Sequence, residues 1–252
     1  MPADKFKESA KTLLSLLEKS AASCSEGLTR ASLAFSGGLD SAIFAGILRK
    51  RIGLELVATG VAGSYDLSNA ASAASQLGMP LKQIVLTKEQ IWAAADAVSR
   101  IITPANRLNV EIAVPFYILS KQITTRHLFA GQGADELFGG YSRYTRSKNA
   151  LRDMDADTSA LPLVINRREA RVCNKFGVEL LLPYLGKELA LYALSLPVEY
   201  RISGENRKAV LREAGRLLGL PPAITNQKKK AMQYGSGISK ALRGYWTANS
   251  AL

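Results

Sequence analysis

The sequence has few residues of the kinds that hold metal ions or cross-link a chain. It contains one histidine, His127, and two cysteines, Cys24 and Cys173, among 252 residues. The cysteines lie far apart and form no Cys-x-x-Cys pair, so they predict neither a zinc site nor an iron–sulfur cluster. We expect both thiols to be free in a reducing compartment, and we expect the lone histidine, in or next to a strand, to be structural.

Long apolar runs are also missing. Hydrophobic residues make up 47% of the chain and charged residues 21%, as in soluble globular proteins, and no stretch is long enough to cross a membrane. The first 28 residues have apolar side chains at helical spacing, which predicts an amphipathic helix and not a secretory leader. We therefore expect a cytoplasmic protein without membrane association.

Acidic residues are outnumbered. The chain has 33 Lys and Arg against 21 Asp and Glu, a formal net charge of +12. This excess favours an anionic partner, and the basic clusters at 49–51, 167–171 and 228–230 leave nucleic acid open as one. No aromatic residues interleave with these clusters, as a stacking surface would require, so a solvated basic face is the preferred interpretation.

Strand and helix patterns alternate through the first half of the chain. Strands are predicted near 31–35, 54–60, 81–86 and 126–131, and helices near 40–50, 67–77, 88–102 and 110–124. This alternation predicts an α/β fold with a parallel, doubly wound sheet.

We divide the chain into an N-terminal helix (1–28), an α/β core (29–150) and a helical C-terminal part that completes the active site (151–252). The polar stretch 141–158 lacks apolar periodicity and is predicted to be a mobile loop or lid.

A glycine-rich turn links the first predicted core strand to the helix after it. Glycines let the backbone approach phosphate oxygens closely, and a helix N-terminus attracts anions. An aspartate there would repel phosphate unless a cation intervened, which suggests Mg²⁺. A turn with an ordinary helix cap is the alternative. The candidate phosphate-binding residues are Phe35, Ser36, Gly37, Gly38, Leu39, Asp40 and Ser41.

A second glycine-rich segment, residues 131–141, follows the strand predicted near 126–131. Its aspartate, Asp135, lies at the carboxyl end of a strand, where open α/β sheets bind their ligands. Asp40 lies at the end of another strand, so the two carboxylates are candidates to share a Mg²⁺ that bridges ATP phosphates. An acidic helix N-terminus with a glycine-rich turn is the alternative.

These two segments resemble the nucleotide-binding loops of the asparagine synthetase family, whose synthetase domain is an ATP pyrophosphatase. The second matches a pattern of Gly-Glu-Gly-Ser-Asp-Glu followed by Phe-Gly-Gly-Tyr, and further matches run from about residue 30 to about residue 240. They include residues 60–66 and 114–117, a Lys-x-x-Leu-Arg helix at 208–212, and Lys228.

The resemblance implies an ATP pyrophosphatase fold that binds ATP and Mg²⁺, with Asp40 and Asp135 as metal ligands. It implies catalytic roles for Gln132 and Asp135, and for Lys228 as the lysine that contacts pyrophosphate, with Lys229 and Lys230 as the alternatives if the register is shifted. The remaining nucleotide-binding candidates that it implies are Thr59, Gly60, Val61, Gly131 and Gly133.

The sequence departs from the family pattern mainly on the acceptor side. Gln132 replaces a glutamate thought to assist amide formation, and a neutral amide cannot take a proton at accessible pH. Gly186 replaces an aspartate, and Glu111 and Asn226 stand where arginines are expected. The nucleotide machinery is thus predicted to be intact, while the acceptor is less constrained.

The predicted function is that of an AMP-forming ligase that activates a carboxylate, aspartate or a related acid, as an acyl-adenylate for amide formation. The family's glutaminase domain has no counterpart in these residues, so nitrogen would come from ammonia, another donor or a separate glutaminase subunit. The alternatives are a tRNA-modifying adenylating enzyme, which explains the net charge better, and a nucleotide-binding module without amide-forming activity.

Overall fold

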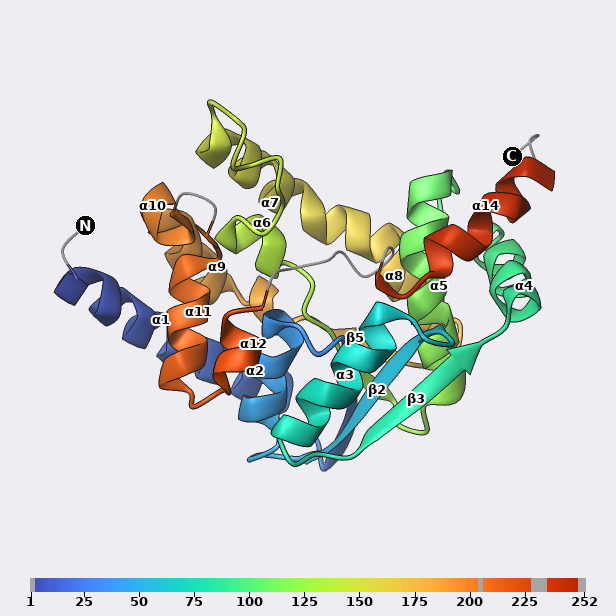
Figure 1. The fold of residues 1–252 in the computed structure, drawn as a ribbon, viewed down its shortest axis with the longest axis horizontal. Helices are drawn as coiled ribbons and strands as arrows, with labels where there is room; N and C mark the ends of the chain where they lie inside the picture. The colour runs from blue at the N-terminus through green and yellow to red at the C-terminus, as the bar shows by residue number, and fades with distance from the viewer. Residues whose placement is uncertain (1–2, 204–205, 228–234, 249–252) are drawn as a thin grey trace.

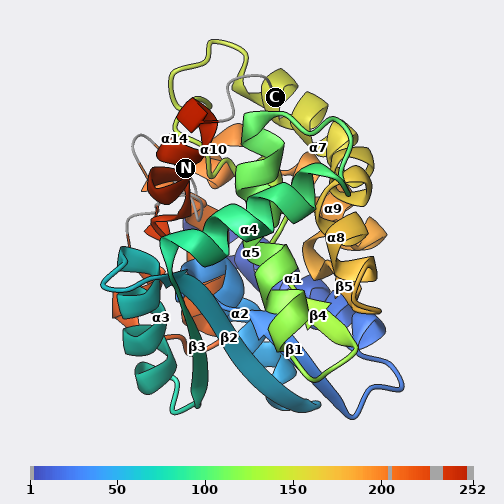
Figure 2. The ribbon, with the colours of Figure 1, turned by 90° about the vertical axis from the view of Figure 1, so that its right-hand side faces the viewer.

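The structure is a computed structural model that describes residues 3–203, 206–227 and 235–248. Its centre is a five-stranded parallel sheet (Figure 1), and the strand order β3-β2-β1-β4-β5 can be followed in Figure 2. This arrangement confirms the predicted α/β class with a parallel sheet. The strands are β1 (Arg30–Ala34), β2 (Gly53–Val61), β3 (Leu81–Leu86), β4 (His127–Phe129) and β5 (Glu179–Leu181).

The fifth strand was not predicted. β5 pairs in parallel with β4, with His127 opposite Glu179 and Phe129 opposite Leu181. It has three residues, as β4 does, but it lies between two helical segments and is not followed by a glycine-rich loop that would mark a strand end. The sheet therefore takes its last strand from the region 151–252, which we expected to be helical, and it is not completed within residues 29–150.

Helices cover both faces of the sheet. Alternate residues of β2 point to opposite sides, because Leu56 and Ala58 join one buried apolar cluster and Val57 joins the other. The first cluster lies under α1 (Ala3–Cys24), α2 (Leu39–Leu48), α3 (Tyr65–Gln76), α9 (Lys187–Ser195) and α11 (Ala209–Leu217). The second lies under α4 (Lys88–Ser99), α5 (Arg107–Gln122), α8 (Glu169–Asn174) and α14 (Ile238–Ala248), of which α4 and α5 face the viewer in Figure 2.

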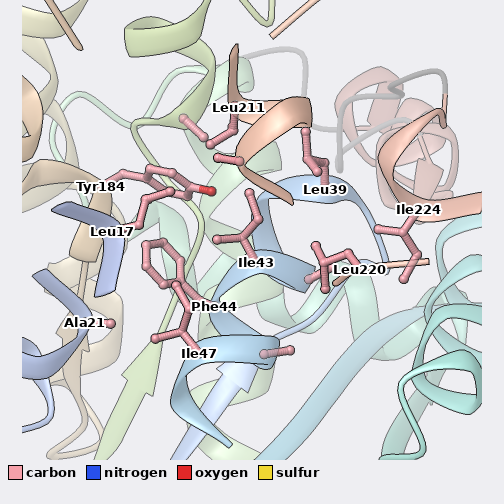
Figure 3. Close-up of a cluster of buried hydrophobic side chains, with 14 of the residues drawn as sticks. Leu17, Ala21, Leu39, Ile43, Phe44, Ile47, Tyr184, Leu211, Leu220 and Ile224 are labelled. Carbon is pink, nitrogen blue, oxygen red and sulfur yellow. The ribbon is translucent and has the colours of Figure 1, made fainter. Parts of the chain in front are cut away.

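The helix α2 is held firmly from several sides, and this fixes the loop before it. Ile43 and Phe44 are fully buried, and the cluster around them draws side chains from α1, α11 and the 3-10 turn η1 (Pro183–Leu185) (Figure 3). The ring of Tyr184 packs edge-on against Phe44 at 4.6 Å between centroids, and its hydroxyl donates to the carbonyl oxygen of Asp40 at 3.2 Å. Tyr184 of η1 therefore holds the start of α2 in place through both contacts.

The stretch 141–158, which we expected to be a mobile loop or lid, is helical in its second half and makes side-chain contacts of its own. A long helix, α7 (Ala150–Arg167), begins within it. Tyr144 is buried, and its hydroxyl donates to a carboxylate oxygen of Asp157 on α7, while Arg143 pairs with the same carboxylate and lies over two tyrosine rings. The aromatic residues of this stretch therefore pack locally, which a periodicity search does not detect.

Among the described helices, none is both long enough and apolar enough to traverse a lipid bilayer.

The remaining elements are short. The short elements are α6 (Ala134–Phe138), α10 (Val198–Arg201), α12 (Pro222–Thr225) and a hairpin of β6 (Ile202–Ser203) and β7 (Asn206–Arg207).

Candidate functional site

A cavity opens at the carboxyl ends of β1, β2 and β4, bounded also by α5, α7 and α11. This is the edge of a parallel sheet at which open α/β folds bind ligands. Most residues predicted from the sequence line it, and both glycine-rich loops contribute to its wall. Those residues are Phe35, Ser36, Gly38, Leu39, Asp40, Ser41, Thr59, Gly131, Gln132 and Asp135.

The first loop keeps its shape through glycine geometry and a neighbouring amide. Gly37 has φ +72°, and a Cβ there would overlap the backbone of Asn69 in α3. The amide of Asn69 donates to the carbonyl oxygen of Ser36 at 2.7 Å. The hydroxyl of Ser41 donates to the carbonyl oxygen of Gly38 at 3.1 Å, and Gly38 is the N-cap of α2. The N-terminus of α2 therefore faces the cavity on a fixed backbone.

Other predicted residues support the cavity from behind. Gly60 and Val61 are covered by the chain around residue 236, because the amide of Val61 donates to the carbonyl oxygen of Ser236 at 3.0 Å and a Cβ on Gly60 would meet that same oxygen. Gly133, with φ +96°, packs against Leu185. Lys228 lies outside the residues that the structure describes.

The two predicted metal ligands meet on one cation, the side chain of Lys208. Its Nζ lies 2.6 Å from each carboxylate oxygen of Asp40 and 2.7 Å from Oδ1 of Asp135. The loops themselves touch, since a Cβ on Gly131 would lie 3.1 Å from Cβ of Asp40. The prediction that Asp40 and Asp135 converge therefore agrees with their geometry, and the lysine between them was not foreseen.

Lys208 sits in an unusual local setting just before α11. It is only 3% exposed, and its φ of +60° is the single positive value at a non-glycine residue in the described chain. Burial lowers the pKa of its ammonium, while the charge of Asp40 acts in the opposite direction. In the sequence this lysine is recognisable only as the first residue of a Lys-x-x-Leu-Arg match, with no role predicted for it.

Gln132 is oriented by a buried ion pair. Its Nε2 donates to Oε1 of Glu169 at 2.8 Å, and the fully buried Glu169 carboxylate accepts two hydrogen bonds of 2.9 Å from Arg168. A carboxylate only accepts hydrogen bonds, so the amide nitrogen of Gln132 must face it and Oε1 is the amide atom left to accept. From the sequence we expected Arg168 to belong to a solvated basic face. It points inward instead, and it also donates to Oδ1 of Asn109 at 3.0 Å.

Another carboxyl group in the cavity wall, that of Glu136, has a pKa shifted by burial. Glu136 lines the cavity and accepts a hydrogen bond of 2.7 Å from the hydroxyl of Tyr141. Burial raises the pKa of Glu136 above its usual 4.5, against the opposing effect of that hydrogen bond. Burial also raises the pKa of Tyr141, so this phenol stays protonated and donates.

The raised pKa of Glu136 predicts a pH dependence of stability. The folded chain holds this proton more tightly than the unfolded chain, so the contribution of Glu136 is complete below its unfolded pKa and is lost as pH rises through its folded pKa. Glu136→Gln removes the ionisation while keeping an acceptor for Tyr141. The variant should therefore gain thermal stability relative to wild type as pH rises from 4.5. Parallel melting curves from mildly acidic to mildly alkaline pH measure this difference, and a constant difference would contradict the assignment.

Two further charged residues tie the chain around the cavity. Arg212 donates to the carbonyl oxygens of Thr225 at 2.5 Å and Gln227 at 2.9 Å, so it fixes the backbone that leads into residue 228. Glu111, found where the family pattern has arginine, accepts from Ser239 at 2.7 Å and Trp246 at 3.1 Å in α14. Its carboxylate thus anchors the C-terminal helix to α5.

The fold and the cavity define a protein of the open α/β class with two glycine-rich loops at the carboxyl edge of a parallel sheet. The sequence model of the family described as asparagine synthase matches residues 12–162 and 156–248. The chain therefore belongs to the asparagine synthase family.

This chain spans only part of the length of the relatives that it matches. Asparagine synthetase B [glutamine-hydrolyzing] of Escherichia coli is 28% identical over 229 residues, which are 81% of this chain and 41% of that protein. The human asparagine synthetase [glutamine-hydrolyzing] is 30% identical over 216 residues, 79% of this chain and 38% of its own. A Methanocaldococcus jannaschii relative is 27% identical over 278 residues, and this chain spans 51% of it.

A solved structure, NMN synthetase from Francisella tularensis, aligns with 95% of this chain and 86% of its own at 13% identity and a TM-score of 0.47.

Proposed function

We propose that this chain is the synthetase part of an ATP-dependent, AMP-forming ligase that activates a carboxylic acid for amide formation. Family membership supports the reaction class. The single observation that carries the proposal is the convergence of Asp40, Asp135 and Lys208 beside the N-terminus of α2, in a cavity that both loops line. Such a site suits a polyphosphate, which needs backbone donors and bound cations together.

The residues at hand fit a Mg²⁺ ion that arrives with ATP. Carboxylate oxygens of Asp40 and Asp135 already surround a common cation position, marked by the ammonium of Lys208. Within the described residues no group of three or more His, Cys, Asp and Glu could hold a metal, and both cysteines are free. Mg²⁺ commonly takes one or two carboxylates plus substrate phosphates, so two ligands from the protein suffice. When bound, the ion would neutralise phosphate charge.

In the proposed reaction an oxygen of the substrate carboxylate attacks the α-phosphorus, the bond to the bridging oxygen breaks, and pyrophosphate leaves. A nitrogen nucleophile then attacks the acyl carbon and releases AMP. The protein contributes chiefly position and charge: the loop 36–41 orients the phosphates, and Lys228 is our candidate for the charge on departing pyrophosphate.

Gln132 would act on the nitrogen nucleophile. Its free amide oxygen accepts a hydrogen bond from an amine or ammonia but cannot remove a proton. Ammonia, whether free or delivered by a separate glutaminase subunit, is the nitrogen source that we favour. Aspartate or a related acid is the carboxylate.

Incubation with ATP and Mg²⁺, with a panel of carboxylic acids and with bulk tRNA in a parallel arm, tests the proposal. Pyrophosphate release that depends on one acid supports a carboxylate ligase. Release that depends on tRNA alone would favour the tRNA-modifying alternative, which the net charge of +12 keeps in view. No release in any arm would leave a nucleotide-binding module and contradict the proposal.

From the sequence alone we expect Gln132→Glu to raise asparagine formation, since glutamate is the family residue at this position. The contact with Glu169 leads to the opposite expectation: Gln132→Glu should lower stability and fail to improve amide formation, because it brings a second carboxylate against the buried Glu169. Two carboxyl groups at hydrogen-bonding distance cannot both be ionised without a large cost. We expect a loss of about 1–3 kcal/mol in unfolding free energy.

The matched control is the exchange Gln132→Glu with Glu169→Gln, which restores one carboxylate and one amide. The double variant should be more stable than the sum of the two single losses predicts, by about 0.5–3 kcal/mol, as found for residues in contact. Additive losses in denaturant unfolding would show that the contact between residues 132 and 169 does not orient the glutamine.

A further inference from the structure

Lys208 fills the position between two carboxylates that the proposed function assigns to a divalent cation. Its ammonium lies within 2.7 Å of three oxygens, two on Asp40 and one on Asp135. Asp40 and Asp135 lie in the first turns of α2 and α6, which follow different strands, and without a cation their charges would repel each other. The lysine therefore does in the free protein what a metal would do in a loaded one.

The surrounding backbone is built to admit this lysine. Lys208 has a positive φ, which residues other than glycine rarely adopt. Its ammonium is buried, and burying a charge is unfavourable unless the charge is paired. A Cβ on the neighbouring Gly140 would overlap both the carboxylate of Asp135 and Cε of Lys208, so this position has room for glycine but not for a larger residue. Uncommon conformations of this kind persist where the rest of the fold holds them in place.

We propose that Lys208 is the resident cation of this site: it holds Asp40 and Asp135 together and keeps divalent ions out until nucleotide arrives. The inference rests on the proposed function for the identity of the nucleotide. An ammonium and a divalent cation compete for the same carboxylate oxygens, and the two carboxylates alone offer a metal few ligands. Phosphate oxygens add both ligands and negative charge, so the metal enters together with ATP. Lys208 is thus a positioning residue for the metal ligands.

Binding of Mn²⁺ to the full chain without nucleotide tests this role directly, followed by the loss of the free Mn²⁺ signal in electron paramagnetic resonance. Lys208→Asn is the informative variant, because asparagine is neutral and tolerates a positive φ. We expect it to bind Mn²⁺ at least about tenfold more tightly than wild type, since a like charge has been removed from the site. Lys208→Arg, which keeps the charge, should bind as weakly as wild type.

Asp135→Asn added to Lys208→Asn should abolish the gain and so locate the bound Mn²⁺. Equal affinity of wild type and Lys208→Asn would overturn the proposal. If melting curves show that Lys208→Asn does not fold, Lys208→Gly serves in its place. Tight Mn²⁺ binding by nucleotide-free wild type that Asp135→Asn removes would also overturn it. The assay contains neither ATP nor an acid, so failure of the proposed function would leave its outcome unaffected.

Discussion

Asp135→Asn and Asp40→Asn should each lower pyrophosphate release by more than about a hundredfold, because a direct ligand matters more than the outer partners whose loss typically costs 10–100-fold. Both carboxylates contact the Lys208 ammonium, and both face the cavity in which the phosphates are proposed to bind. Asparagine keeps the shape of the side chain but removes its charge. Steady-state pyrophosphate release at saturating Mg²⁺ and ATP measures the effect.

The matched control is Asp155→Asn, which makes the same chemical change at an exposed position on α7. It should release pyrophosphate at the wild-type rate. Circular dichroism and melting curves establish that each variant is folded. A folded Asp135→Asn protein with wild-type release would show that the two carboxylates do not share a metal.

Gly140→Ala should be nearly as damaging, although it adds a single methyl group. The new Cβ would overlap Oδ1 of Asp135 and Cε of Lys208, so the carboxylate and the ammonium must separate. A small displacement of catalytic groups can cost about a hundredfold in rate. We expect a loss of that size in pyrophosphate release, accompanied by a drop in melting temperature as the buried pair is disturbed.

Gly53→Ala is the control for this change. Gly53 lies at the start of β2, at the end of the strand remote from the cavity, and its added Cβ would meet a flexible arginine side chain at 3.3 Å and a carbonyl oxygen at 3.4 Å. Its activity should remain close to that of wild type. A Gly140→Ala protein with unchanged pyrophosphate release would mean that the contact between Asp135 and Lys208 is dispensable.

The part of the fold that could be predicted from the sequence is the part with strong periodic patterns. This part comprises β1, β2 and β3 and the helices α2 to α5. Each of these elements is buried on one face or on both, and the spacing of its apolar residues indicates the element type directly. β5 is a three-residue strand between helical segments, and the start of α7 depends on contacts between Tyr144, Arg143 and Asp157. Contacts between distant side chains leave no periodic signal, so neither feature could be predicted.

The candidate site was predictable where backbone shape carries the chemistry. The loop around Gly37 is rich in glycine, and this composition is typical of few structures other than tight turns and phosphate-binding loops, so it could be recognised in the sequence. Glu169 and Lys208 are single charged residues, and no local pattern around them indicates their role. The pairing of Gln132 with Glu169 brings together positions that lie 37 apart in the chain. Gly186 has a structural reason that was also invisible: a Cβ there would overlap the hydroxyl of Ser20 in α1, so the aspartate of the family pattern would not fit.

The defining step of the proposed reaction is the attack of a carboxylate oxygen on the α-phosphorus of ATP in this cavity. It is tested most directly by supplying the activating acid with its carboxylate labelled in heavy oxygen, and analysing the nucleotide product by mass spectrometry. We expect the product to be AMP carrying one labelled oxygen, formed in equal amount with pyrophosphate, because breakdown of an acyl-adenylate leaves a carboxylate oxygen on the phosphate. Unlabelled AMP, or ADP with inorganic phosphate, would contradict it.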